Sequence, residues 1–391
     1  MSLKIASHMD LSSFIVMDVM RDAQALEAQG MDIKHLEVGQ PRTPAPAPAI
    51  KAIRDALPEI ASHGYTLALG MPPLRDAIAA LYQRWYGKYI DPARIVVTVG
   101  SSLGFEMALL TCFEPGDVIA LPCPGYPAYR NLLRVLGLRV LDIPTRADTN
   151  WRLNIAHLRS LKEKPNGLIL ASPMNPTGAT LNATELKEIA HYCHETGIRL
   201  ISDEIYHGIT FDGPAASAVD MTPSAIVVNS FSKYFSMTGY RIGWMVVPDK
   251  LVDPLERLSQ NLIISVPTLS QIAALAAMTE EESFSELDGH VARYRANRDI
   301  LMSHLPKEFL GNVTQPEGAF YLYADTRAIS SDSKDLCKRL LHEAHVALTP
   351  GIDFDPFEGH LAVRLSFAGS EIDMQEACKR VSQWVNSEVK S

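Results

Sequence analysis

Short apolar runs alternate with longer segments of helical periodicity along the middle of the chain, from about residue 50 to residue 250. Runs of this length, separated by helical segments, are typical of a mostly parallel sheet that helices cover on both faces. One further run, residues 242–247, follows so closely on its predecessor that it permits antiparallel pairing. The preceding runs, which we expect to form strands, are residues 95–99, 118–121, 139–143, 167–171, 198–202 and 225–229.

The N-terminal flank follows other patterns. Residues 12–29 are amphipathic with a helical period, and a short strand that runs into a turn is expected from residue 35. The alternating prolines of residues 43–48 indicate a stiff connector, which marks a crossing between domains.

The C-terminal part combines long helices with isolated strands. Residues 251–278 are expected to be helical despite Pro267, and residues 287–305 form a long charged helix that leads away from the sheet. The remaining predicted elements are strands at 319–323 and 361–366 and a closing helix at 374–385.

These patterns predict an α/β protein with a mostly parallel seven-stranded sheet between helices in a large domain, and a smaller α+β domain. A length of 391 residues suits two domains. We expect residues 1–48 to form an N-terminal arm and part of the small domain. Residues 49–285 would form the large domain, and residues 286–391 the small C-terminal domain.

Composition narrows the class of protein. Apolar residues make up 47% and charged residues 21%, no apolar run reaches membrane-spanning length, and the net charge is −9 with scattered basic residues. We therefore expect no membrane and no nucleic-acid partner. The five cysteines form no CxxC pair and are odd in number, so we expect reduced thiols, a cytoplasmic location and no metal site.

Polar residues follow the ends of several predicted strands, where ligands bind in open α/β sheets. Ser101 and Ser102 open a helix after the first strand, a position that suits a phosphate but, taken alone, is more typical of a plain helix cap. The later strand ends supply an amide, an acid, a phenol, a lysine and an arginine. An aromatic, phosphorylated, carbonyl-bearing cofactor needs such groups. They are Asn175, Asp203, Tyr206, Lys233 and Arg241.

Taken together, these segments resemble the class I/II aminotransferases among the fold-type I enzymes that use pyridoxal 5'-phosphate. The resemblance runs from Gly39 to Arg364, nearly end to end, and its pieces stand in family order. The matching pieces are residues 39–41, 65–70 with 74–75, 175–178, 203–206, 230–235, 239–243, 316–321 and 363–367.

The resemblance implies a role for each residue near the cofactor ring. Lys233 would hold the cofactor as a Schiff base, and Asp203 would pair with the pyridine nitrogen and keep it protonated. Tyr206 and Asn175 would donate hydrogen bonds to the phenolic oxygen, and Tyr126 would stack on the ring.

The resemblance also implies how the phosphate is bound and how subunits associate. Tyr65 would reach the phosphate of the neighbouring subunit, so a homodimer with shared active sites is expected. The residues of the same subunit that would surround the phosphate are Ser101, Ser102, Ser230, Ser232 and Arg241.

The implied reaction moves the amino group of an L-amino acid to a 2-oxo acid, in two half-reactions through pyridoxamine phosphate. Arg364 would bind the substrate α-carboxylate, together with Asn175 and the backbone of Gly39. Lys233, once released from the cofactor, would move the proton from the substrate Cα as general base and acid.

Two alternatives remain open at this point. A carbon–sulfur β-lyase of the same fold would carry much the same motifs and would release pyruvate, ammonia and a thiol. A non-catalytic regulator that binds pyridoxal phosphate is disfavoured. Such proteins usually carry an N-terminal DNA-binding module, and the residues before the predicted sheet show no helix-turn-helix pattern and no basic stripe. For the substrate, the apolar segment that begins at Phe14 favours neutral side chains, whereas Arg42 could bind an acidic side chain.

Overall fold

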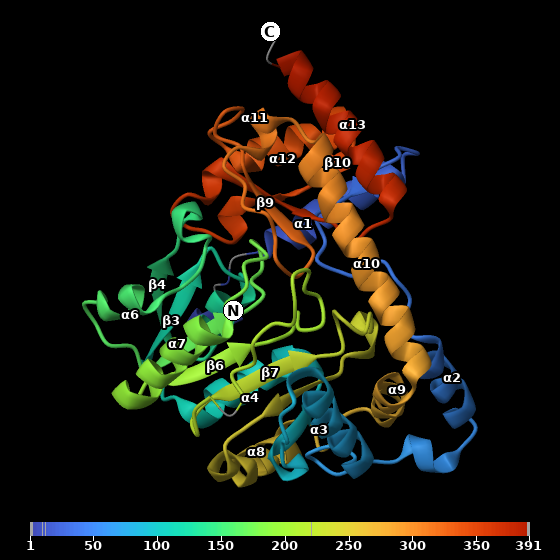
Figure 1. The fold of residues 1–391 in the computed structure, drawn as a ribbon, viewed down its shortest axis with the longest axis vertical. Coiled ribbons are helices and arrows are strands. Elements are labelled where there is room, and N and C mark those ends of the chain that lie inside the picture. Colours follow the sequence, from blue (N-terminus) through green and yellow to red (C-terminus); the bar gives the residue numbers. More distant parts are fainter. Residues whose placement is uncertain (1–2, 10, 12, 220, 389–391) are drawn as a thin grey trace.

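The structure, a computed structural model, describes residues 3–9, 11, 13–219 and 221–388 of the chain. In Figure 1 a layered sheet unit occupies the lower part of the view. A smaller unit around β9 (Tyr321–Asp325) occupies the upper part. The long helix α10 (Glu281–His304) runs from one unit to the other.

A seven-stranded sheet forms the centre of the larger unit. Its strands are β2 (Ile95–Thr98), β3 (Val118–Cys123), β4 (Arg139–Pro144), β5 (Gly167–Ala171), β6 (Arg199–Asp203), β7 (Ile226–Ser230) and β8 (Gly243–Val246). They lie in the order β2-β8-β7-β6-β5-β3-β4. β8 is antiparallel to β2 and β7, and the other neighbours are parallel. The predicted mostly parallel sheet with an antiparallel return is confirmed.

Alternate residues of these strands serve two hydrophobic layers, one on each face of the sheet. Val96 and Met245 belong to a layer with side chains of α4 (Gly100–Cys112), α5 (Ala128–Val135) and α8 (Asp249–Leu262). Val97 and Val246 belong to the layer with α3 (Pro72–Tyr86), α7 (Ala183–Thr196) and α9 (Thr268–Thr279). Burial on both faces explains why the strands read as continuous apolar runs.

The bounds of α7 follow from its end residues. The side chain of Asn182 accepts hydrogen bonds from the backbone N–H groups of Thr184 and Glu185, while Glu185 accepts from the N–H of Asn182. Gly197 ends the helix in the left-handed conformation, with φ at +76°.

One predicted helix is wrong in its extent. Residues 251–278 form two helices, α8 and α9, which are separated by residues 263–267. Pro267 is the N-cap of α9. A proline has no backbone N–H and so cannot donate the hydrogen bond that a continuous helix would need at that position.

The smaller unit joins both ends of the chain. β1 (Lys34–His35) pairs in parallel with β10 (Val346–Ala347), and Ala23 of α1 (Ile15–Glu27) packs on Leu341 and Ala347. A second sheet has the order β11-β12-β9. Its other strands are β11 (Thr349–Pro350) and β12 (Ala362–Ser366). The further helices of this unit are α11 (Lys307–Leu310), α12 (Ser333–Arg339) and α13 (Glu371–Glu388). The division at residues 48 and 285 remains our interpretation.

Residues 43–48 are not a connector throughout. Pro46 is the N-cap of α2 (Ala47–Ala56), and Pro48 lies in its first turn, where a proline fits a helix well. A short helix, α6 (Ile155–Arg159), precedes β5. Of the helices in the described part of the chain, none is both long and apolar enough to cross a bilayer. The cytoplasmic location stays a prediction.

Candidate active site

The first predicted group lies where α4 begins. Gly100 has φ at +68°, and a Cβ placed there would lie 2.6 Å from Nη2 of Arg241. Arg241, itself left-handed with φ at 51°, donates from Nη1 to the backbone oxygen of Thr238 at 3.0 Å. A guanidinium and the free N–H groups at the start of α4, which includes Ser101 and Ser102, therefore face the same space. The guanidinium and the N–H groups both attract an anion.

Ser230 and Ser232 organise the turn that follows β7. Both are buried, and their hydroxyl oxygens are 2.9 Å apart. The hydroxyl of Ser230 is also 3.1 Å from the backbone oxygen of Ile242, and it accepts from the N–H of Ser232. These contacts fix the backbone just before Lys233. A further role of the two serines in binding an anion remains a prediction.

Lys233 points toward the N-terminal part of the chain. Its Nζ donates to the backbone oxygen of Gly39 at 2.6 Å. Burial lowers the pKa of its amine to about 8, and the positive charges of Arg364 and Arg241 act in the same direction. About a tenth of the amine is therefore neutral and nucleophilic at pH 7, far more than for an ordinary lysine.

Asp203 lies at the end of β6 and is 6% exposed. Its Oδ1 accepts from the backbone N–H of Ile205 at 3.1 Å, and its Oδ2 accepts from the hydroxyl of Tyr129. Burial raises the pKa of this carboxyl to about 6, although both donors oppose the rise. Such a carboxylate favours a cation beside it.

Tyr129 was not singled out by the sequence. It lies in α5, and its ring packs on Tyr126 with centroids 5.3 Å apart. In sequence a tyrosine on an amphipathic helix is typical of core packing. Only the neighbourhood of α5 and β6 in space shows that its hydroxyl reaches Asp203.

Tyr206 and Tyr321 form a pair of phenols, with their hydroxyl oxygens 2.7 Å apart. A Cβ at Gly39 would lie 2.0 Å from the hydroxyl oxygen of Tyr321, so only glycine fits at that position. Tyr321 stands in a matched sequence segment, but no role was predicted for it.

Arg364 is 3% exposed and lies between two aromatic rings. Its Cζ is 4.5 Å from the ring centroid of Tyr321 and 4.6 Å from that of Phe354. Nη1 donates to Oδ1 of Asn175 at 3.0 Å, and Nη2 donates to the backbone oxygen of Glu37. Nε is buried and has no hydrogen-bond partner among the described residues. Arg364 thus keeps donor capacity in a place that favours an anion.

Tyr126 and Tyr65 differ in surroundings. Tyr126 contacts Phe14 edge to face with centroids 6.0 Å apart, and burial raises the pKa of its hydroxyl to about 12. Tyr65 is 81% exposed. The fold therefore brings Gly39, Asp203, Tyr206, Arg241 and Arg364 close to Lys233 and leaves Tyr65 on the surface.

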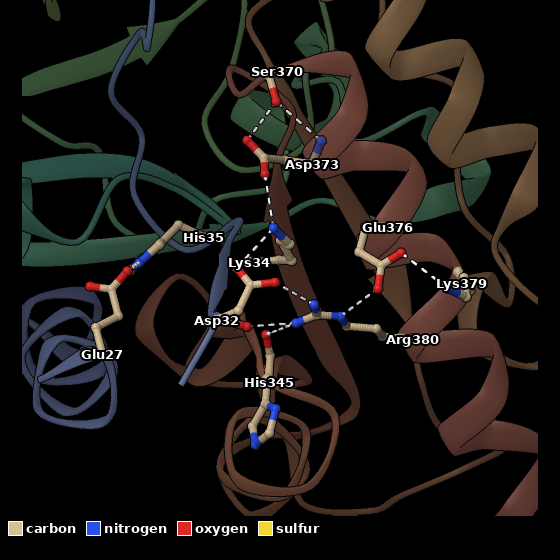
Figure 2. A network of polar contacts seen from close by, with 10 residues as sticks. All are labelled: Glu27, Asp32, Lys34, His35, His345, Ser370, Asp373, Glu376, Lys379 and Arg380. Atoms are coloured by element: carbon tan, nitrogen blue, oxygen red, sulfur yellow. Dashed lines mark hydrogen bonds and ion pairs between the residues drawn. The ribbon is translucent and has the colours of Figure 1, made fainter. Parts of the chain in front are cut away.

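Arg42 lies on the outside of the smaller unit. Its side chain is exposed. The Glu37 carboxylate raises the pKa of His35, and the positive charge of Arg42 opposes that rise. His35 is part of the polar network in Figure 2, where it contacts Glu27.

Known proteins match this chain nearly end to end. The family model for class I and II aminotransferases matches residues 32–381. A protein of Mycobacterium tuberculosis named valine–pyruvate aminotransferase is 43% identical over 390 residues, which cover 99% of this chain and 100% of the relative. The (5-formylfuran-3-yl)methyl phosphate transaminase of Methanocaldococcus jannaschii is 35% identical, over 97% of this chain and 98% of the relative.

The fold agrees with these sequence matches. A crystal structure of an aminotransferase from Mycobacterium tuberculosis superposes with a TM-score of 0.95. The two chains are 42% identical, and the match covers 99% of this chain and 100% of the other.

Proposed function

The chain belongs to the class I and II aminotransferases, which depend on pyridoxal phosphate, and on this premise we propose roles for its site residues and a class of substrates. Its relatives support amino-group transfer between amino acids and 2-oxo acids, and they give no support to the carbon–sulfur lyase.

The residues at the strand ends fit the cofactor. Arg241 and the start of α4 would bind its phosphate, since the guanidinium lies against Gly100. The buried carboxylate of Asp203 would take a protonated ring nitrogen as its missing cation, and the amine of Lys233 suits the aldehyde. When bound, the cofactor supplies an electron-accepting ring conjugated to the carbonyl carbon that takes the amino group.

We assign substrate orientation to Arg364. This is the central proposal, and the observation that carries it is a buried guanidinium whose Nε has no partner in the described chain. The rings of Tyr321 and Phe354 limit its movement, and its bond to Asn175 sets the direction of the fork. A substrate α-carboxylate bound there would be held by charge-assisted hydrogen bonds and would fix the Cα–H bond relative to the ring.

Lys233 would act twice. As a neutral amine it would attack the aldehyde. After release, its Nζ would take the proton from the substrate Cα and pass it to the cofactor carbon that takes the amino group. A pKa of about 8 keeps the amine able both to accept and to give a proton near neutral pH. The backbone oxygen of Gly39 provides a resting position for Nζ at 2.6 Å.

We propose that the preferred substrates are neutral amino acids, aliphatic or aromatic. Phe14 and Tyr126 form an apolar edge at the N-terminal side of the site. Arg42, the residue that could have served a second carboxylate, lies near His35 instead. The relative that is 43% identical is named valine–pyruvate aminotransferase, and valine and pyruvate both have neutral side chains.

A homodimer is the proposed assembly. Large apolar residues are exposed on two adjoining segments: Ile60, Tyr65 and Leu67 on one, and Leu262 and Ile264 on the other. Hydrogen bonds join these segments, for example from the hydroxyl of Thr268 to the backbone oxygen of Gly64 at 2.6 Å. Exposed apolar patches of this kind mark protein interfaces. Light scattering should give twice the chain mass, and a monomer would contradict the proposal.

The test of the substrate class is a panel of amino donors. Valine, alanine, leucine, phenylalanine, glutamate and aspartate are supplied to the holoenzyme, and pyridoxamine phosphate is followed by its absorption. We expect faster conversion with the neutral donors than with glutamate or aspartate. Preference for the acidic donors would overturn the substrate class and leave the reaction standing.

A further inference from the structure

A buried polar cluster lies behind the turns that carry the site residues. We call Tyr86, Ser172, Glu204, His207 and Ser217 the Glu204–His207 cluster. None of the five was given a role from the sequence. Glu204 is fully buried and His207 is 1% exposed. Buried charged and polar groups are costly unless they are bonded, so such a cluster requires an explanation.

Glu204 follows Asp203 directly and is surrounded by donors. Oε2 accepts from the hydroxyl of Ser217 at 2.7 Å. Oε1 accepts from the backbone N–H of Ala218 at 2.7 Å and from the hydroxyl of Ser202 at 3.1 Å. These bonds fix the start of the turn between Asp203 and Tyr206.

His207 closes the same turn, and its Nδ1 lies 3.4 Å from Oε2 of Glu204. Its other two contacts fix the tautomer of the ring. Burial lowers its pKa to about 4, so the ring is neutral near pH 7. Nε2 lies 2.9 Å from the backbone oxygen of Ser172, which can only accept, so Nε2 carries the proton. Nδ1 must then accept from the hydroxyl of Tyr86, its neighbour at the end of α3.

The cluster therefore joins two strand-end turns. The bond from His207 reaches Ser172, which opens the turn that holds Asn175. The N–H of Ser172 in turn donates to the backbone oxygen of Asp203 at 3.1 Å. Asn175 accepts from Arg364 through Oδ1, which leaves its Nδ2 as a donor on the other side.

The end of α3 also supports the turn of Lys233. Trp85, next to Tyr86, packs on Tyr234 and Phe235 with centroids 5.3 and 6.5 Å away. One helix end thus backs all three segments: the lysine turn, the Asp203–Tyr206 turn and the Asn175 turn.

We propose that Glu204, His207 and Tyr86 are positioning residues of this aminotransferase, which hold Tyr206 and Asn175 where both donate to the phenolic oxygen of the cofactor. The inference rests on the roles proposed above for those two donors. It predicts that loosening the cluster weakens both donor contacts without removing either side chain.

The expected signature is spectroscopic. Hydrogen bonds to an ionised oxygen stabilise it, so their loss raises the pH at which the visible band of the bound cofactor changes. It should also weaken cofactor binding. The variants leave in place the charged and titratable groups that act on Lys233 and Tyr206, which are Asp203, Arg241, Arg364, Tyr126 and Tyr321.

The experiment compares Tyr86→Phe with Tyr82→Phe. Both changes remove a phenol hydroxyl from α3 and keep the ring, and the two rings pack on each other with centroids 5.5 Å apart. The hydroxyl of Tyr82 accepts from Nε1 of Trp244, whereas that of Tyr86 bonds Nδ1 of His207. We expect Tyr86→Phe to raise the midpoint of the visible band by about half a unit to one unit and to weaken cofactor affinity about threefold to tenfold. Tyr82→Phe should lower the melting temperature and leave the midpoint unchanged.

Two histidine variants sharpen the result. His207→Gln keeps an N–H that can reach Ser172 and should shift the midpoint less than His207→Leu. If Tyr86→Phe and the histidine variants lower thermal stability but leave both the midpoint and the cofactor affinity at wild-type values, the cluster is merely structural. If His207→Leu does not fold, Tyr86→Phe decides alone.

A separate variant distinguishes failure of this inference from failure of the proposed roles. Tyr206→Phe removes the proposed donor itself. A wild-type midpoint in that variant would overturn the role of Tyr206. A shifted midpoint in Tyr206→Phe with none in Tyr86→Phe would overturn only the role of the cluster.

Discussion

Two polar regions of the molecule differ in how much water reaches them. In the network of Figure 2, Arg380 bonds Asp32 at 2.6 Å and Lys34 bonds it at 3.0 Å, and the side chain of Asp32 is 64% exposed. At the candidate active site, Asp203 and Arg364 are only 6% and 3% exposed. Acidic and basic residues in the two regions therefore differ in how far they are exposed to water.

The difference explains why the site carries the chemistry. Water reaches Asp32 and screens these pairs, in which Lys34 and Arg380 are 14% and 19% exposed, so the pairs add little net stability and leave their members charged at any ordinary pH. Burial instead moves the pKa of Lys233 down to about 8 and that of Asp203 up to about 6. Groups whose pKa lies near the working pH can exchange protons during a reaction.

The strongest test of this comparison replaces one lysine from each region with alanine. Lys233→Ala should lower turnover by about four orders of magnitude and abolish the visible absorption of the bound cofactor, because the nucleophile and the proton carrier are lost together. Lys34→Ala removes a lysine from the network and should leave both unchanged. Turnover and absorption spectra check the pair, and a Lys233→Ala protein that keeps them would remove the lysine assignment.

The arginines give the next largest effect. Arg364→Ala should lower kcat/KM by about a hundredfold to a thousandfold, since the substrate carboxylate loses a charge-assisted pair in a buried place. Arg380→Ala breaks bonds to Asp32 and Glu376 and should leave kcat/KM unchanged. Steady-state kinetics with a good donor measure both. Equal losses in the two variants would mean that Arg364 acts only through stability.

The smallest effect is a pH dependence. The amine of Lys233 is nucleophilic only when neutral, and its lowered pKa puts that change at about 8. The rate at which apoprotein captures pyridoxal phosphate should therefore rise as pH increases through about 8. Asp32→Asn should leave this profile in place. Stopped-flow absorbance measures the capture rate, and a rise only near the ordinary lysine pKa of 10.5 would contradict the burial argument.

Much of the sheet was predictable because burial on both faces leaves a continuous apolar run for each strand. The antiparallel return of β8 was likewise expected from its short connection to β7. The break at residues 263–267 was missed, since the apolar spacing continues across it while the backbone does not. A proline there decides the local geometry more strongly than periodicity does.

The site was predictable where its residues follow strands. Lys233, Asp203 and Asn175 lie at neighbouring strand ends, and parallel strands bring such ends to one edge of a sheet. Tyr129 and Tyr86 could not be found this way. Both lie in helices, and what their hydroxyl groups bond depends on which helix lies beside which turn.

The hairpin formed by β7 and β8 has a consequence for how the chain tolerates change. Because β8 runs backwards, its first residue, Gly243, stands opposite Ser230, the last residue of β7. One loop therefore departs with Lys233 and comes back with Arg241 only eight positions later. An insertion or deletion between these two residues would displace both in a single step, so we expect this loop to be the least permissive to length variation.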